Sequence, residues 1–309
     1  MGLRIIHPGL AATIQDEGRP GYRAFGVPPG GAFDRASFAM ANALVANPPG
    51  CAAIELTSSG GEYEASETIA IGLAGAPMPA TVLGPGRQPR TLAISCSTTL
   101  HPGERLKLGR AATGFRTYLA VAGGWPTPVT LGSRSDEGRL GPGRIIAARP
   151  GRCPDRRLKN ADGDRGSASF RIIDGADSGW VGSGEWISST FRVGSGSDRM
   201  GLRLEGPIPT LAVATDRTST PVGPGTIQHT GRGIIILGVA CGTLGGYPQV
   251  GHLISADIDR LGQLGPGEPI RLERVELAEA RELDREHRRA IRARVDVVRE
   301  LAADGLRFD

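Results

Sequence analysis

Short apolar stretches separated by Gly and Pro turns make up most of this chain. Residues 53–57 alternate between apolar and polar side chains, which is typical of a strand with one buried face, and residues 68–73 form an apolar run that predicts a buried strand. The same patterns predict strands at residues 3–7, 12–16, 92–95, 104–108, 116–121, 170–173, 224–228, 233–239, 250–254 and 270–275. Strands and helices do not alternate along the chain. The pattern therefore predicts all-β barrels or sandwiches and argues against a dinucleotide-binding fold.

Two stretches have the periodicity of a helix. Residues 36–45 carry apolar side chains at helical spacing, and Asp34 stands where this helix would begin, a favoured place for a short acceptor side chain. A second apolar stripe, flanked by Glu and Arg, follows residue 276; its members are Leu277, Ala280, Leu283, His287, Ile291, Val295 and Val298. It predicts a long terminal helix over residues 276–309 that packs on a barrel, with a coiled-coil dimer arm as the alternative.

Residues 141–169 interrupt this organisation. They are rich in Gly, Pro, Arg and Asp and include Arg152, Arg156 and Arg157, but they show no periodicity. This composition predicts an irregular linker, although a basic patch for phosphates is the alternative. A boundary in this stretch gives an N-terminal subdomain over residues 1–150, a C-terminal subdomain over residues 151–275 and a terminal helix over residues 276–309.

Composition and charge narrow the class of protein. The chain has 309 residues, of which 39% are hydrophobic, so it can bury a sizeable core in one large or two medium domains. Its 47 Gly and 23 Pro residues follow no repeat, which favours tight turns over collagen or disorder. The net charge of +4 and an aromatic content of 5% argue against nucleic acid as a partner.

The sequence also bears on compartment and metals. Residues 1–18 lack the apolar core of a signal peptide, and the longest apolar runs are too short to cross a bilayer. Cys51, Cys96, Cys153 and Cys241 are far apart in sequence and the histidines are isolated, so no metal site is expected. We expect a protein of the reduced bacterial cytosol, without a membrane segment.

The loop over residues 26–35 is the strongest candidate for chemistry. Its prolines and glycines, among them Gly30 and Gly31, combine fixed and permissive backbone angles. The loop therefore presents backbone N–H groups, Asp34 and Arg35 beside the start of a helix. Such an arrangement can bind an anion or a carboxylate, or it can be a plain turn before a capped helix.

Several motifs in a fixed order resemble one known family. They lie at residues 8–10, 14–19, 26–35, 41–45, 55, 118–124, 131–135, 197–201, 203–207, 224–228 and 245–248. Each motif alone is weak, but the ordered set is similar to the biotin-dependent carboxyltransferase family. That family includes the C subunit of 5-oxoprolinase, the kinase-inhibitor antagonist KipA, also described as allophanate hydrolase subunit 2, and the carboxyltransferase part of urea carboxylase.

The resemblance implies a mainly β fold of two cyclophilin-like β-barrel subdomains with a C-terminal helix. It also implies a KipI-like partner subunit, similar to allophanate hydrolase subunit 1, and a small amide or urea-type substrate. The implied reaction is ATP-dependent cleavage of 5-oxoproline or carboxyl transfer from carboxybiotin, with ATP or carboxybiotin supplied through partner subunits and no cofactor bound directly. The alternative is a non-catalytic, KipA-like antagonist of a KipI-like partner.

This chemistry needs donors for a developing oxyanion and an acid or base for the amide proton. We therefore assign catalytic roles to Asp34, Asp198, Arg199 and Glu205, and substrate binding to Arg35, Gly30, Gly31, Arg203, Gln228 and Tyr247. Arg199 and Arg203 could grip a carboxylate in bidentate fashion. The alternatives are an internal salt-bridge network for the charged residues and a packed turn residue for Tyr247. We expect the 26–35 and 197–205 segments to line one groove.

The chain departs from the family at two positions. Members usually carry an acidic residue before the Val that precedes the Pro-Gly-Thr-Ile-Gln motif, where this chain has Thr220. They usually carry another ahead of the Gly-Gly-Tyr-Pro motif, where this chain has Ala240. We therefore expect the usual family reaction to be impaired in this protein.

Overall fold

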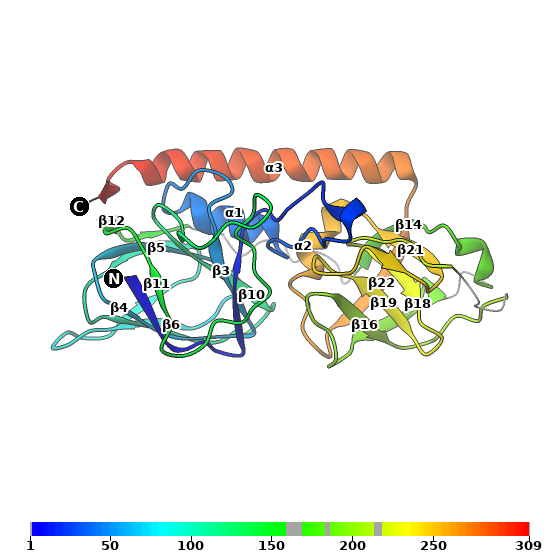
Figure 1. The fold of residues 1–309 in the computed structure, drawn as a ribbon, viewed down its shortest axis with the longest axis horizontal. Coiled ribbons are helices and arrows are strands. Elements are labelled where there is room, and N and C mark those ends of the chain that lie inside the picture. Colours follow the sequence, from blue (N-terminus) through cyan, green and yellow to red (C-terminus); the bar gives the residue numbers. More distant parts are fainter. Residues whose placement is uncertain (1, 159–168, 183–185, 213–217, 309) are drawn as a thin grey trace. The chain divides into compact units, whose positions relative to one another are not determined.

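The computed structural model describes residues 2–158, 169–182, 186–212 and 218–308. The chain forms two compact units, and each is described by itself. The first comprises Met1–Arg19, Asp34–Gly163 and Ile291–Asp309, and the second comprises Pro20–Phe33 and Asp164–Ala290. The mainly β fold with a C-terminal helix, predicted from the sequence, is confirmed (Figure 1).

Two six-stranded sheets enclose the core of the first unit. The first sheet has the order β11 (Ile145–Ala147), β1 (Gly2–His7), β4 (Ser59–Ala65), β9 (Arg105–Arg110), β6 (Ala80–Leu83) and β7 (Arg90–Leu92). The second has the order β13 (Arg156–Arg157), β8 (Cys96–Leu100), β5 (Ile69–Gly75), β10 (Arg116–Val121), β3 (Ala53–Thr57) and β2 (Ala11–Gln15). Apolar side chains from both sheets, including Ile5, Ile71 and Leu119, form one buried cluster.

Helix α1 (Arg35–Ala43) covers the second sheet of this unit. Its buried side chains include Phe38 and Ala41, as its helical spacing predicts. Gly72 on β5 lies under the helix, where an added Cβ would stand 2.4 Å from the carbonyl oxygen of Ala41. The glycine therefore allows close approach of helix and sheet.

The seven strands of the second unit close into a barrel. Their order is β14 (Ser169–Asp174), β21 (Gln249–Leu253), β18 (Thr226–His229), β19 (Ile234–Leu237), β16 (Gly201–Glu205), β15 (Thr190–Val193) and β22 (Pro269–Arg274). Neighbouring strands are antiparallel except β14 and β22, which pair in parallel. Phe170, Phe191, Ile227 and Leu253 lie in the barrel core. Outside the barrel, β17 (Thr220–Pro221) pairs with β20 (Leu244–Gly245), and η1 (Arg23–Phe25), η2 (Ser178–Trp180), η4 (Ser255–Asp257) and α2 (Ile258–Leu261) are short helices.

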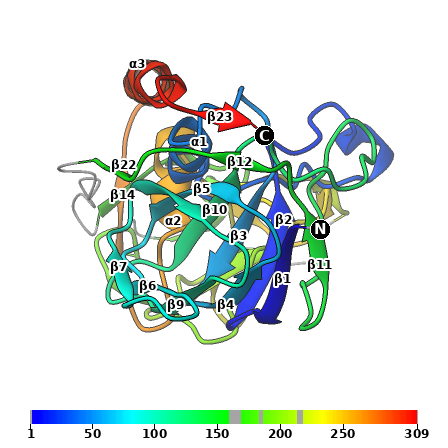
Figure 2. The same cartoon turned by 90° about the vertical axis from the view of Figure 1, so that its left-hand side faces the viewer.

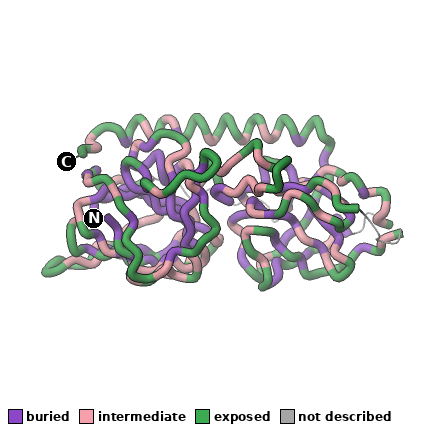
Figure 3. Tube along the Cα trace, viewed as in Figure 1, coloured by how far each residue is buried: buried purple, intermediate pink, exposed green. Residues whose placement is uncertain are grey.

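The predicted terminal helix is α3 (Leu277–Ala303). In the second unit Ala280 packs with Ile254 and Val275, and in the first unit Val295 and Val298 are buried. The outward face of α3 is exposed (Figure 3). The apolar stripe is thus covered by the chain itself, which supports packing on the domains and not a coiled-coil arm. Leu277, however, is exposed, contrary to its place in the predicted stripe.

The C-terminal end of α3 is fixed to the first unit by hydrogen bonds. Arg299 Nε donates to the carbonyl oxygen of Asn47 at 3.0 Å, and Arg156 Nη1 donates to the carbonyl oxygen of Ala302 at 3.0 Å. The last strand, β23 (Arg307–Phe308), pairs with β12 (Gly151–Arg152) (Figure 2). A guanidinium at the end of a helix satisfies carbonyl groups that have no partner within the helix.

The structure differs from the sequence prediction in two stretches. Residues 145–157, expected to be part of an irregular linker, contain β11, β12 and β13; residues 159–168 of that linker lie outside the described residues. These strands have only two or three residues each, and β12 and β13 consist mostly of arginine, so they are too short to show a hydrophobic period. The strand predicted at residues 92–95 is wrong beyond Leu92, because the chain turns at Ser95 (φ 65°) and the buried strand begins at Cys96.

Candidate functional site

The loop over residues 20–33 is attached to one end of the barrel in the second unit. The N–H of Gly30 donates to the carbonyl oxygen of Val239 at 3.1 Å, and Arg199 Nη2 donates to the carbonyl oxygen of Gly31 at 2.6 Å. Both glycines have positive φ, 60° and 87°, which a residue with a side chain adopts only with strain. The sequence-predicted residues Gly30, Gly31 and Arg199 are thus brought together.

Phe33 anchors the same loop in the barrel. Its side chain is fully buried in the core. A Cβ added at Gly238 would stand 3.0 Å from its ring, and one added at Gly262 would stand 3.1 Å from it. These two glycines therefore leave the space that the ring occupies. The guanidinium of Arg199 and the ring of Phe33 hold the loop in place. Arg199 therefore stabilises the loop, in addition to the catalytic role predicted for it.

Asp34 begins helix α1 in the first unit. Its Oδ1 accepts from the N–H of Ser37 at 2.9 Å and its Oδ2 from the hydroxyl of Ser37 at 2.6 Å. The side chain is buried. The predicted helix start is confirmed, and the carboxylate acts as an N-cap. Arg35, the first residue of α1, is exposed.

A buried polar network fixes the backbone at Asp34. The N–H of Asp34 donates to the hydroxyl of Tyr118 at 2.8 Å, and that hydroxyl donates to Glu55 Oε2 at 2.7 Å. Arg116 Nε lies 3.2 Å from Glu55 Oε1, and both of these side chains are at most 3% exposed. Burial, followed by the negative charges of Glu55 and Asp34, raises the pKa of Tyr118 well above its ordinary value. The tyrosine therefore remains a neutral hydrogen-bond donor.

The remaining predicted charged residues lie on β16 and the turn before it. Asp198 is exposed, and its Oδ1 accepts from the N–H of Met200 at 2.8 Å and of Gly201 at 3.3 Å. Arg203 and Glu205 are exposed at alternate positions of β16. Asp198 thus stabilises its own turn, and Arg203 and Glu205 present their side chains to solvent on one face of the strand.

Gln228 and Tyr247 belong to a second polar group, on the outer face of the barrel. Gln228 is buried, and its Nε2 donates to the carbonyl oxygen of Tyr247 at 3.4 Å. The ring of Tyr247 is half exposed. Nearby, Gln249 Nε2 donates to Thr220 Oγ1 at 2.9 Å. Thr220, where the resemblance leads us to expect an acidic residue, therefore acts as a hydrogen-bond acceptor here.

Sequence reasoning missed the residues around Arg23. The loop over residues 222–226 carries Gly223 under the guanidinium of Arg23. Thr226 Oγ1 lies 3.4 Å from His252 Nδ1, across the β18–β21 pair. Burial lowers the pKa of His252, and the charge of Arg23 lowers it further. Burial raises the pKa of Cys241 to about 11, although Arg23 opposes this. The described barrel end thus carries a guanidinium, a neutral imidazole and a protonated thiol.

Asp16 is a further buried carboxylate that the site prediction omitted. Its oxygens accept from the hydroxyls of Ser133 at 2.6 Å and Ser135 at 2.7 Å, and from the N–H of Arg134 at 2.5 Å and of Gly18 at 2.8 Å. Burial alone would raise the pKa of Asp16, but these hydrogen bonds outweigh it and lower the pKa. Two sequence motifs, at residues 14–19 and 131–135, therefore meet through one carboxylate.

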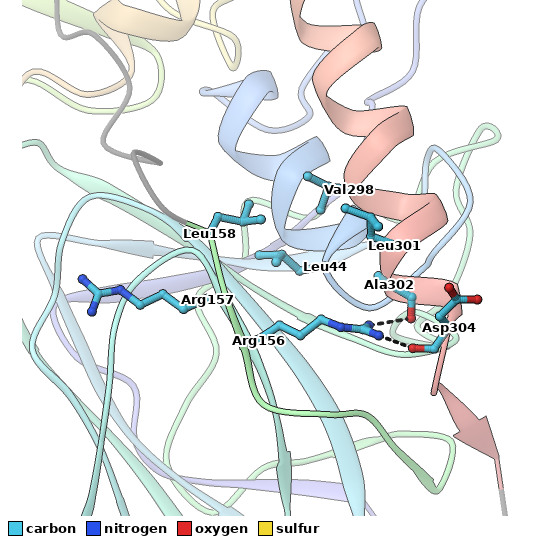
Figure 4. Close-up of a pocket in the computed structure, with 8 residues that line it drawn as sticks. All are labelled: Leu44, Arg156, Arg157, Leu158, Val298, Leu301, Ala302 and Asp304. Carbon is cyan, nitrogen blue, oxygen red and sulfur yellow. Dashed lines mark hydrogen bonds between the residues drawn. The ribbon is translucent and has the colours of Figure 1, made fainter.

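A cavity of about 390 Å³ lies elsewhere in the first unit, beside the C-terminal end of α3 (Figure 4). Leu44, Leu158, Val298 and Leu301 supply its apolar walls. The guanidinium of Arg156 points to the carbonyl oxygens of Ala302 and Asp304, to which it donates hydrogen bonds, and is thus used in capping α3. None of the residues that were assigned a catalytic or substrate-binding role lines this cavity, but Arg156 and Arg157, which belong to the alternative basic patch, do.

The described residues hold no group of three His, Cys, Asp or Glu side chains that could bind a metal ion. None of the described helices is long and apolar enough to cross a membrane. The four cysteines are all free thiols.

Comparison with known proteins identifies relatives over most of the chain. The family model described as "Carboxyltransferase domain, subdomain A and B" matches residues 25–274. The chain is 32% identical over 305 residues to the C subunit of 5-oxoprolinase from Escherichia coli (strain K12), covering 90% of this chain and 93% of that protein. It is 27% identical over 326 residues to urea amidolyase of Lachancea kluyveri, covering 90% of this chain and 17% of that protein.

A solved structure shares the fold. The crystal structure of the Kluyveromyces lactis urea carboxylase superposes with a TM-score of 0.81 at 24% identity, covering 94% of this chain and 29% of that one. The chain therefore spans less than a third of the urea amidolyase and of the urea carboxylase, but nearly the whole length of the 5-oxoprolinase C subunit.

Proposed function

The chain belongs to the family of carboxyltransferase domains with subdomains A and B, and on this premise we propose that it is a subunit of an enzyme complex that acts on a small cyclic amide. The observation that carries the proposal is the alignment with the 5-oxoprolinase C subunit, which covers 93% of that protein at 32% identity. The chain would act with a KipI-like partner subunit in the bacterial cytosol. ATP, or carboxybiotin in a transfer reaction, would reach the substrate through partner subunits.

A polar group of the second unit supports this proposal. Attack on an amide develops negative charge on its carbonyl oxygen, which positioned donors stabilise. The buried side-chain amide of Gln228 would be such a donor in the second unit. The other assigned roles, of Asp34, Asp198 and Glu205 in catalysis and of Arg35 and Arg203 in binding, remain predictions.

One observation favours a second function, that of a non-catalytic regulatory paralogue. Thr220 and Ala240 stand where the family usually carries acids. Thr220 accepts a hydrogen bond from Gln249, and the N–H of Ala240 donates to the carbonyl oxygen of Arg199 at 3.0 Å. Both residues thus have hydrogen bonds at their positions without a carboxylate. Such a chain would keep the fold and bind a KipI-like partner as a KipA-like antagonist does.

Reconstitution with a KipI-like subunit and the further subunits of a 5-oxoprolinase tests both functions. ATP-dependent release of glutamate from 5-oxoproline is measured, with urea carboxylation in parallel. We expect little turnover by the wild type and a rise when Thr220→Asp is combined with Ala240→Asp, because one positioned acid or base contributes about 10²- to 10⁴-fold. Thr220→Asn with Ala240→Asn is the matched control, since it adds similar side chains without the charge.

The outcomes separate the alternatives. Robust wild-type turnover that the double Asp variant leaves unchanged or reduces would show that these acids are not needed here, while supporting the enzyme. A chain that binds its KipI-like partner but gives no turnover in any form would favour the regulatory function. Failure to bind the partner together with absence of turnover would contradict both.

A further inference from the structure

The guanidinium of Arg23 lies flat on Gly223. A Cβ added at Gly223 would stand 2.7 Å from Nη1, 2.7 Å from Nη2 and 2.8 Å from Cζ. Nearly equal distances to these three atoms mean that the plane of the guanidinium faces the glycine. The residue at 223 must therefore lack a side chain for the guanidinium to keep this position. Gly223 is buried, but Arg23 itself is exposed, so part of its surface is open to a ligand.

The groups beside Arg23 do not neutralise it. Cys241 is buried, and His252 is half-buried with its Nδ1 next to the hydroxyl of Thr226. Arg23 is the charged group that acts on the pKa of both Cys241 and His252, and in the described residues no carboxylate contributes to either shift. The thiol is protonated and the imidazole is neutral at pH 7. Among these three described side chains, Arg23 therefore carries the charge.

We propose that Arg23, supported by Gly223 and next to His252, binds the carboxylate of the substrate. One guanidinium matches one carboxylate in charge and offers two parallel N–H groups to its two oxygens. A phosphate dianion would exceed the available positive charge, and neutral urea would leave the guanidinium without a counter-charge. The ligand class is thus a small monocarboxylate joined to an amide, as in 5-oxoproline. This inference rests on the proposed function for the amide part of the ligand, and on the geometry around Arg23 for the carboxylate.

Binding by the full chain tests the carboxylate site without any turnover. Calorimetric titration at pH 7.5 and low salt compares 5-oxoproline with 2-pyrrolidinone, which has the same ring and amide but lacks the carboxylate. Urea and inorganic phosphate are titrated in parallel. We expect 5-oxoproline to bind about 10- to 100-fold more tightly than 2-pyrrolidinone, the usual value of a hydrogen bond to a charged group. Equal affinities, or tighter binding of phosphate, would overturn the inference.

Two variants act on Arg23 in different ways. Arg23→Gln removes the charge, and Gly223→Ala keeps the charge but displaces the guanidinium. Both should weaken 5-oxoproline binding at least about tenfold and leave 2-pyrrolidinone binding unchanged. Each variant has a matched control. Arg232→Gln removes an exposed guanidinium from the β18–β19 turn. Gly179→Ala adds a Cβ that would meet nothing within 4 Å.

A second readout is independent of any ligand. Because the charge of Arg23 lowers the pKa of His252, Arg23→Gln should raise that pKa in an NMR titration, while burial keeps it below the ordinary value. An unchanged His252 pKa, with 5-oxoproline affinity equal to that of the wild type, would overturn the inference even if both variants fold.

Turnover then distinguishes this inference from the proposed function. A complex that cleaves 5-oxoproline as fast with Arg23→Gln as without it would contradict the carboxylate site and support the function. Arg23-dependent binding of 5-oxoproline by a chain or complex that never turns it over would support the site and contradict the function. Absence of carboxylate binding by both the chain and the complex would overturn the site.

Discussion

Substitution Tyr118→Phe tests whether the buried network holds the start of helix α1. The change removes one oxygen from a side chain with no exposed surface and leaves its ring in place. The ring packs edge-on against Phe38, with centroids 6.0 Å apart and planes at 75°. The substitution therefore preserves the packing and removes two hydrogen bonds, one to Glu55 Oε2 at 2.7 Å and one from the N–H of Asp34 at 2.8 Å.

The expected loss of stability follows from these two bonds. A hydrogen bond to a charged group contributes about 1.5–3 kcal/mol, and one to a neutral amide about 0.5–1.5 kcal/mol. The first unit should therefore lose about 2–4 kcal/mol of unfolding free energy. At about 2–4 °C per kcal/mol for a domain of this size, its melting temperature should fall by roughly 4–16 °C.

Urea unfolding and calorimetry of the full chain measure this loss. Tyr247→Phe is the matched control, because it removes the same atom from a half-exposed ring and should change stability by less than about 0.5 kcal/mol. Hydrogen exchange adds a local readout, since the amides at the start of α1 should exchange faster in Tyr118→Phe. A loss below about 0.5 kcal/mol would show that the network around Glu55 reorganises without the hydroxyl, and that it does not fix Asp34.

Three further predictions concern Asp16, Arg156 and His252. Asp16→Asn should cost about 2–4 kcal/mol at pH 7, because hydrogen bonds to a carboxylate are replaced. Since the folded pKa of Asp16 is lowered from 3.8, the wild-type advantage should shrink as pH falls below 3.8 and through the folded pKa, which urea unfolding in a pH series downward from pH 7 can show. Arg156→Met should lower stability by about 1–2 kcal/mol and speed amide exchange in the last turn of α3, because it removes the guanidinium from the carbonyl of Ala302. The lowered pKa of His252 means that the imidazole binds a proton more readily in the unfolded chain than in the folded one. The free energy of unfolding should therefore rise with pH between the folded pKa and about 6.5. His252→Gln should reduce this dependence of stability on pH, measured by urea unfolding between pH 5 and about pH 7.

The sequence patterns predict an element correctly where interactions between residues close together in the sequence determine it. The period of the apolar residues correctly predicts α1 and α3, because each of these helices buries one stripe. Asp34 was correctly expected at a helix start, since its carboxylate needs only the N–H of Ser37, three residues away. The apolar run over residues 68–73 corresponds to β5, which is paired on both sides and buried.

The sequence patterns fail where the hydrogen-bond partner of a buried polar residue lies far away in the sequence. Strand β8 is fully buried although its sequence, Cys-Ser-Thr-Thr-Leu, is largely polar. Two of its hydroxyls bond to the segment between β12 and β13, because Thr99 Oγ1 donates to the carbonyl oxygen of Cys153 at 2.8 Å and Ser97 Oγ to that of Pro154 at 3.2 Å. A hydroxyl that donates to a carbonyl oxygen costs little to bury. Hydrophobicity alone therefore misplaced β8 and missed the short strand β13, which pairs with it.

Gly223 shows the same limit at the candidate site. In sequence it stands in a Val-Gly-Pro-Gly stretch that predicts a turn, and a turn is sufficient to explain a glycine. Yet its φ is not among the positive values, whereas that of Gly225 is 90°. The reason for glycine at 223 is therefore space, and the group that takes the space is Arg23, 200 residues earlier in the chain. A Cβ at residue 223 would displace the guanidinium of Arg23 without straining the backbone. The substitution Gly223→Ala therefore tests the role of Arg23 in binding separately from the folding of the loop. Substitution of a glycine with positive φ could not do so, because it would strain the backbone.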